Sequence, residues 1–199
     1  PERERREIVK IQQVPNHLID AIFAVEDQRF LEHRGIDLRR ILGALIVNVK
    51  AGGVRQGGST LTQQLVKNFF LTPERTLKRK VQEALMALLV EIRYDKTEIL
   101  VCYLNEIYLG QRGGAAVHGV GEAALHYFGK PVSELTLSEA ALIAAIIQSP
   151  NGLSPRRQPD KAIKRRNLVL ELMYKQGRIH AGQLRGARLV ELDLAPLRG

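Results

Sequence analysis

The sequence has no tryptophan and a single cysteine, Cys102, among its 199 residues. One cysteine excludes an intrachain disulfide, and its place in an apolar helical pattern beside Val101 and Tyr103 predicts a buried structural thiol. The longest uninterrupted apolar run, Ala140 to Ile147, has 8 residues, whereas a membrane-spanning helix needs about 20. Neither a membrane span nor a signal peptide is therefore predicted within these residues.

Metal-binding and aromatic signals are also sparse. The five histidines show no HExxH-like spacing, so no metal-ligand set is expected. Aromatic residues make up only 5% of the chain, although hydrophobic residues reach 45%, which is enough for a sizeable core. The formal net charge is +9, which suits an anionic partner such as nucleic acid, an acidic membrane surface or a phosphorylated substrate.

Helical periodicity predominates along the chain, and no segment of five or more residues alternates convincingly. We therefore predict an all-α fold of about eight to nine helices. Thr136-x-x-Glu139 predicts the cap of a central buried helix, and Asp160 is expected to cap the last long helix. Other helices are expected to end at Gly110 and, after a small-residue helix reaching Phe128, at Gly129.

An acidic pair follows the first apolar helical pattern. Asn16 is a plausible cap for this helix, which is expected to run through Glu26 and Asp27 to a stop at Gly35. An acid at the C-terminal end of a helix faces the negative end of the helix dipole, which tends to raise its pKa and suits a general base. The alternative is an ordinary solvated helix end.

The stretch from Gly57 to Asn68 concentrates hydrogen-bonding side chains in one short segment. Ser59 or Thr60 can cap a helix here, and Thr60-x-x-Gln63 has the spacing of a capping box. Gln64, Lys67 and Asn68 then share one helical face. These groups suit a sugar or phosphate ligand, and the alternative is a well-capped surface helix.

A long helix is predicted to start at Thr72-Pro73. Its buried stripe is expected to consist of Leu77, Val81, Leu85, Leu88 and Ile92. Arg75, Arg79, Lys80 and Glu83 line one side of the helix. They form either ordinary surface ion pairs or a cationic rail that holds a pyrophosphate beside a reacting centre.

The helix predicted from Leu38 to about Lys50, capped by Asp37, is apolar nearly all round. Such a helix is buried or enters a membrane surface, and burial is the simpler interpretation.

Taken together, the motifs resemble the peptidoglycan glycosyltransferases (glycosyltransferase family 51), the glycosyltransferase domain of class A penicillin-binding proteins, in particular the 1b type. Five segments in order carry this resemblance. They are Glu26-Asp27-x-x-Phe30-x-x-His33-x-Gly35, Gly58-Ser59-Thr60-x-Thr62-Gln63-Gln64-x-x-Lys67-Asn68, Arg79-Lys80-x-x-Glu83, Tyr103-Leu104-Asn105-x-Ile107-x-x-Gly110, and a looser match around Pro150-Asn151 and Arg165-Arg166-Asn167.

The resemblance implies a lysozyme-like helical lobe and a smaller membrane-associated jaw at about residues 38–58. The glycosyltransferase domain would cover residues 15–199. Residues 1–14 would follow a membrane anchor that the chain does not contain. This implication turns the interpretation of the 38–50 helix toward partial membrane contact.

The resemblance also implies a reaction, in which lipid II is polymerised into β-1,4 glycan strands with inversion and release of polyprenyl pyrophosphate. Glu26 would be the general base, and Glu83 would orient the cations or assist at the donor site. The residues implied in substrate binding are Asp27, Phe30, His33, Ser59, Thr60, Gln63, Gln64, Lys67, Asn68, Arg75, Arg79 and Lys80.

The implied partners are lipid II, the growing lipid-linked strand, the membrane surface and a transpeptidase domain in the parent chain, but no nucleic acid. No cofactor is required, although a divalent cation, Mg²⁺ or Mn²⁺, could bridge the pyrophosphate. The implied location is the outer face of the bacterial cytoplasmic membrane.

Two other functions compete with this interpretation. A glycan hydrolase or lytic transglycosylase of lysozyme-like fold also uses acidic residues, but its sugar leaving group needs a proton donor rather than several cations. A nucleic-acid-binding module would explain the basic charge, but aromatic residues for stacking are few and the sequence shows no known binding signature.

Overall fold

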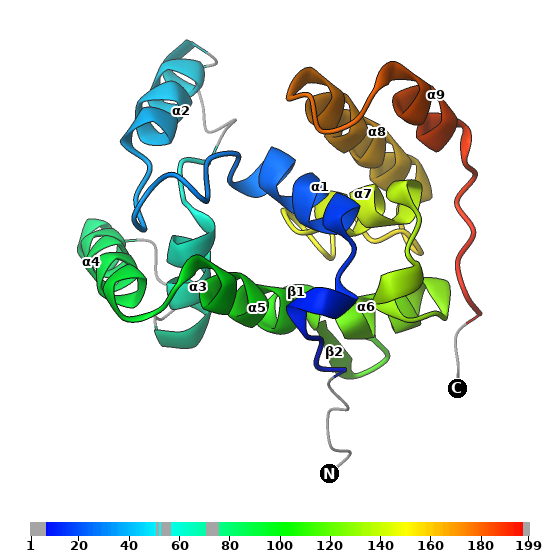
Figure 1. Ribbon diagram of the computed structural model, residues 1–199, viewed down its shortest axis with the longest axis horizontal. Helices are drawn as coiled ribbons and strands as arrows, with labels where there is room; N and C mark the ends of the chain where they lie inside the picture. Colours follow the sequence, from blue (N-terminus) through cyan, green and yellow to red (C-terminus); the bar gives the residue numbers. More distant parts are fainter. Residues whose placement is uncertain (1–6, 51, 53–56, 71–75, 197–199) are drawn as a thin grey trace. The chain divides into compact units, whose positions relative to one another are not determined.

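The structure, a computed structural model, describes residues 7–50, 52, 57–70 and 76–196 of the chain (Figure 1). These residues form two compact units. The first unit comprises residues 1–25 and 104–199, and the second comprises residues 26–103.

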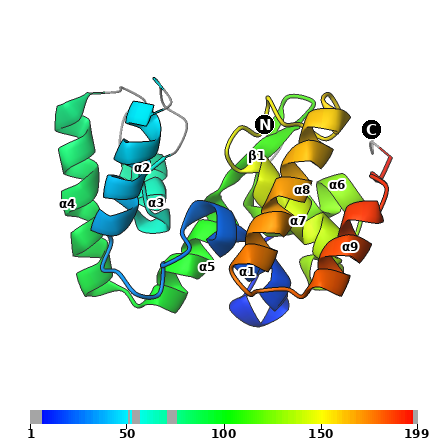
Figure 2. The same cartoon turned by 90° about the horizontal axis from the view of Figure 1, so that it is seen from above.

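In the first unit, α7 (Leu137–Ile146) is the central helix, as predicted. Its capping box between Thr136 and Glu139 is present, and Ser138 and every residue from Ala140 to Ile146 are buried. It packs against α8 and also contacts α6 and α9 (Figure 2). The other elements of this unit are η1 (Ile11–Gln13), β1 (Tyr108–Arg112), β2 (Ala115–His118), α6 (Gly119–Phe128), η2 (Val132–Glu134), α8 (Pro159–Lys175) and α9 (Ala181–Leu189).

Two helices cross the boundary between the units. They are α1 (Asn16–Glu26), whose last residue begins the second unit, and α5 (Lys96–Glu106). The second unit also contains α2 (Leu38–Lys50), α3 (Leu61–Phe70) and α4 (Leu77–Arg93). The helices α3 and α4 pack against each other. The predicted, predominantly helical fold is thus confirmed.

Two predicted helix ends are wrong. The helix α1 ends at Glu26, not at Gly35. Gly35 instead adopts a left-handed conformation (φ 84°), and a Cβ atom there would lie 2.8 Å from the carbonyl oxygen of Ala87 in α4. A glycine is therefore needed at this point for a close backbone approach rather than for a helix stop.

The helix expected to continue to Gly110 also ends early, at Glu106. A short antiparallel hairpin follows, in which β1 pairs with β2. The glycine-rich turn closes it, with Gly113 at φ 57°. Two strands of five and four residues are too short to give a clear alternating pattern in the sequence.

The buried stripe predicted on α4 is wrong. Leu77 and Ile92 are 87% and 82% exposed, and Val81, Leu85 and Leu88 are exposed as well. The residues that α4 buries are Glu83 and Ala87. Periodicity identifies an apolar face, but it does not reveal whether another element covers that face.

The simpler interpretation of the 38–50 helix, that it is buried, is also wrong, because α2 buries only Ala44 among its described side chains. Leu42, Leu45, Ile46 and Val49 are all more than half exposed. The Asp37 cap is confirmed, since its carboxylate accepts a hydrogen bond from the Arg40 amide at 3.1 Å. In the part of the chain that the structure describes, no helix has the length and apolar character needed to span a membrane.

Three smaller predictions fall on helix starts and on the cysteine. Cys102 is exposed, because α5 turns its neighbours Tyr103 and Leu104 inward instead. The helix α8 begins at Pro159, with Gln158 rather than Asp160 at the cap position. The start predicted at Thr72-Pro73 lies outside the described residues, and α4 is capped by the Thr76 hydroxyl group.

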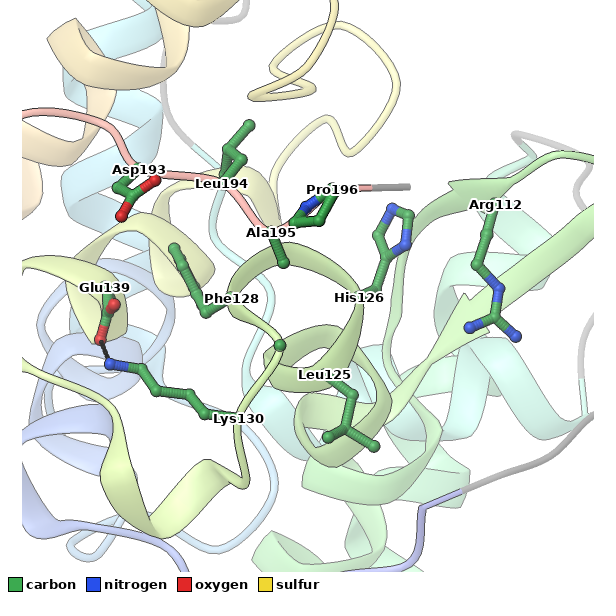
Figure 3. Close-up of a pocket in the computed structure, with 11 residues that line it drawn as sticks. Arg112, Leu125, His126, Phe128, Lys130, Glu139, Asp193, Leu194, Ala195 and Pro196 are labelled. Carbon is green, nitrogen blue, oxygen red and sulfur yellow. Dashed lines mark ion pairs between the residues drawn. The ribbon is translucent and has the colours of Figure 1, made fainter. Parts of the chain in front are cut away.

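A hollow of about 440 Å³ lies in the first unit beside α6 (Figure 3). His126 and Arg112 line it, together with Lys130 and Glu139, which form an ion pair of 2.8 Å. Burial lowers the pKa of His126 to about 4, and the positive charges of Arg156 and Arg112 add to the shift. The folded protein therefore keeps this imidazole neutral at pH values where the unfolded chain protonates it.

This difference predicts a pH-dependent loss of stability between about pH 6.5 and pH 4. Because the unfolded state binds the proton first, the free energy of unfolding falls as the pH is lowered through this range. Between pH 7 and pH 4.5 we expect it to fall by about 2 kcal/mol more in the wild type than in His126→Gln. Urea unfolding at both pH values measures this difference, and parallel losses in the two proteins would contradict it.

Candidate active site

The predicted site residues that the structure describes all lie in the second unit, where the start of α3 brings two groups of them together. Asp27 is fully buried just after α1 and accepts hydrogen bonds from the His33 Nε2 atom at 2.9 Å and from the amide of Leu61 at 2.9 Å. Leu61 is the first residue of α3. A carboxylate bonded to a helix N-terminus is favoured by the helix dipole, so Asp27 fixes the position of α3.

Glu26 has a different partner from its neighbour. Its Oε2 atom accepts a hydrogen bond of 2.9 Å from the side-chain amide of Gln64. The Oε1 atom of Gln64 accepts in turn from the hydroxyl group of Tyr103 at 3.4 Å. The amide of Gln64 therefore orients the Glu26 carboxylate, and Tyr103 orients the amide.

Tyr103 is a site residue that the sequence analysis did not assign, although it belongs to the fourth motif. It is 1% exposed. Burial raises its pKa well above the ordinary value, and the negative charges of Glu26 and Asp27 add to this effect. The sequence signal for this contact is a tyrosine within the apolar stripe of a helix, because a buried hydroxyl group needs a hydrogen-bonding partner.

Thr60 and Gln63 form the predicted capping box and are both buried. The Thr60 hydroxyl group donates to the carbonyl oxygen of Gly35 at 2.6 Å. The side chains of both residues are therefore engaged in building the start of α3. Phe30 is also fully buried, with its ring edge-on to His33.

A second group surrounds Glu83, which is 1% exposed. Its carboxylate forms ion pairs with Lys80 and, at 3.0 Å, with Arg79. Lys80 also donates to the hydroxyl group of Ser59 at 2.7 Å. Ser59 lies two residues before Leu61, so the chain itself connects the Glu83 group to the Asp27 group.

The remaining predicted residues are less closely involved. Lys67 and Asn68 are exposed in the second half of α3, and Arg75 lies outside the described residues. No cluster of three or more metal-ligating side chains occurs in the described ranges. The hollow beside α6 contains none of the predicted site residues, so it is not the candidate site.

The sequence profile of the family described as Transglycosylase matches residues 1–174. The chain belongs to the transglycosylase family. The resemblance to the glycosyltransferase domain of class A penicillin-binding proteins is thereby confirmed.

Penicillin-binding proteins are among the relatives of this chain. The chain is 49% identical over 174 residues to penicillin-binding protein 1B of Haemophilus influenzae, a match that covers 87% of this chain and 22% of the relative. It is 50% identical over 176 residues to penicillin-binding protein 1A of Aquifex aeolicus (88% and 24%) and 47% identical over 176 residues to penicillin-binding protein 1B of Escherichia coli K12 (88% and 21%). The chain thus spans between a fifth and a quarter of the length of these relatives.

A solved structure agrees with the family assignment. The crystal structure of penicillin-binding protein 1A from Haemophilus influenzae matches this transglycosylase with a TM-score of 0.59 and 27% identity. The match covers 98% of this chain and 19% of the other.

The ion pairs of Glu83 with Arg79 and Lys80 are expected to stabilise the folded protein. Gln in place of Glu83 keeps the shape but leaves Arg79 and Lys80 without a countercharge. We expect Glu83→Gln to lower the free energy of unfolding by about 1–3 kcal/mol, measured by urea unfolding. Glu32→Gln is the matched control, because Glu32 pairs with Arg29 at the surface and should change stability little. Equal stability of both variants would contradict the proposed role of Glu83.

Proposed function

We propose that this domain polymerises lipid II into β-1,4-linked glycan strands. The 4-hydroxyl group of the acceptor sugar attacks the anomeric carbon of the growing strand, and the bond to polyprenyl pyrophosphate breaks on the opposite face, with inversion. The proton of the attacking hydroxyl group passes to a general base, and the electron pair leaves with the pyrophosphate. The domain thus has to supply a base and a set of cations.

The observation that carries the proposal is the hydrogen bond between Gln64 and Glu26. A sugar hydroxyl group is a weak nucleophile, so its proton must be accepted while the new bond forms. Glu26 is the proposed base, because its carboxylate ends a helix and is oriented by a side chain of the second motif. Asp27 is unsuited to this role, since it is fully buried and holds His33 and Leu61.

Pyrophosphate leaves without a proton but gains negative charge as it departs. Arg79 and Lys80, held together by Glu83, are proposed to stabilise that charge. The exposed Lys67 is proposed to add a third cation. The predicted role of Arg75 in binding the pyrophosphate stays a prediction. Ser59, Gln64 and Asn68 would donate to sugar and phosphate oxygens. The proposal requires no metal ion, although Mg²⁺ or Mn²⁺ could accompany the pyrophosphate.

The exposed apolar side chains of the second unit support a lipid-linked substrate. Large apolar side chains are exposed on each of two helices: Leu42 and Leu45 on α2, and Leu77, Leu85 and Ile92 on α4. Large exposed apolar patches mark interaction sites with protein or membrane. We propose that the domain works at the outer face of the cytoplasmic membrane, in a parent protein that also carries a transpeptidase domain.

The test is polymerisation of fluorescent lipid II by the purified domain, with the strands separated by length. Glu26→Gln is expected to lower turnover by roughly 10²–10⁴-fold, the usual contribution of a general base. Glu32→Gln, an exposed acid of the same unit, is the control and should retain activity.

Near-normal polymerisation by Glu26→Gln would overturn the choice of base. Cleavage of preformed glycan strands without any polymerisation would overturn the function itself, in favour of a lytic enzyme.

A further inference from the structure

A second carboxylate on α4, that of Glu91, contacts the start of α3. Its side chain is only 4% exposed. The Glu91 Oε1 atom accepts a hydrogen bond of 2.6 Å from the hydroxyl group of Thr62. Glu91 belongs to none of the five motifs and to neither the proposed base nor the proposed pyrophosphate-binding cations.

Lys96, the first residue of α5, compensates the charge of Glu91. Its Nζ atom lies 2.8 Å and 2.7 Å from the two carboxylate oxygens and 4.4 Å from the centre of the Phe30 ring. Loss of Lys96 would leave the charge of the nearly enclosed Glu91 carboxylate uncompensated, which would strongly destabilise the folded protein. The Glu91–Lys96 pair therefore ties α4 and α5 to the segment that carries Phe30, His33 and Asp27.

The same pair completes a three-point attachment of the first turn of α3. Three consecutive residues at its start are hydrogen-bonded to three different residues. Thr60 donates to the Gly35 carbonyl oxygen, Leu61 to the Asp27 carboxylate and Thr62 to the Glu91 carboxylate. The backbone amide of Gln64 donates to the Thr60 carbonyl oxygen at 3.0 Å, so Gln64 belongs to this turn. The contact that holds Thr62 therefore also holds the turn that carries Gln64, and with it the direction of the Gln64 side chain.

We propose that Glu91, braced by Lys96, is a positioning residue for the proposed base Glu26. It acts through Thr62 and Gln64 and does not touch the substrate. This inference rests on the proposed function, because it assigns Glu91 a role in that reaction.

A positioning role leaves a signature that a purely structural role does not. Hydrogen bonds to a carboxylate depend on distance and angle and stabilise its ionised form. If the turn shifts when Thr62 is released, the bond from Gln64 to Glu26 weakens and the carboxylate takes up a proton at higher pH. The acid limb of the pH–rate profile then moves to higher pH, and kcat falls while KM stays nearly constant.

Several other groups influence the charge of Glu26. Asp27 adjoins it in the chain, His33 binds Asp27, and Tyr103 contacts Gln64 from α5. All of them are retained in the variants proposed here. A change in the Glu26 titration between variants therefore reports on the Gln64 contact.

The experiment compares Thr62→Val, which removes the hydroxyl group at constant volume, with Thr62→Ser, which keeps it. We expect Thr62→Val to lower kcat about tenfold with KM within about twofold, and Thr62→Ser to retain wild-type kcat. Glu91→Met removes the oxygen that accepts from Thr62 and should resemble Thr62→Val. The double variant Thr62→Val/Glu91→Met should lose no more than the larger single loss, because both changes break one contact.

A second measurement does not depend on turnover. Selective ¹³C labelling of glutamate allows the Glu26 carboxyl group to be titrated by NMR in the ligand-free protein. We expect its midpoint to move to higher pH in Thr62→Val and to stay at the wild-type value in Thr62→Ser. Ser138→Ala is the control, because it removes a buried hydroxyl partner of Arg166 in the first unit and should leave the midpoint unchanged.

An unchanged Glu26 midpoint in Thr62→Val would overturn the inference, and so would a Thr62→Ser variant as impaired as Thr62→Val. Should the wild type form no glycan strands, the proposed function fails, while the NMR titration still decides whether Glu91 positions Glu26.

Discussion

The buried carboxylate of Asp27 is the interaction on which the candidate site depends. It accepts hydrogen bonds from His33 and from the first amide of α3, and it is fully buried. Hydrogen bonds to a charged group are stronger than those between neutral groups, and leaving a buried polar group without its partner lowers the free energy of unfolding. Since Ser59 precedes the held amide and Gln64 follows it, the positions of Ser59 and Gln64 depend on this acid.

Adjacent acids in the sequence thus have distinct roles. Asp27 is fully buried and holds the start of α3, while Glu26, oriented by Gln64, is the proposed general base. The third acid, Glu83, keeps Lys80 and Arg79 together although their positive charges repel each other. In the proposed mechanism, the start of α3 therefore holds both the general base and the cations that stabilise the leaving group.

Features that depend on residues a few positions apart could be predicted from the sequence. The capping boxes at Thr60 and Thr136 are examples, since both partners lie within one turn. The Glu26–Gln64 and Gln64–Tyr103 contacts span 38 and 39 residues. All three residues belong to the motifs, but the motifs do not show which side chains pair. The exposed face of α4 was missed because periodicity does not show what covers an apolar stripe.

Hydrogen exchange of the Leu61 amide in wild type and Asp27→Asn tests the central claim most directly. If the Asp27 charge holds α3 in place, the substitution should speed exchange at Leu61 by at least about tenfold, while amides in α7 exchange as before. Unchanged exchange at Leu61 in a folded Asp27→Asn protein would contradict the account, because α3 would then be held without this carboxylate.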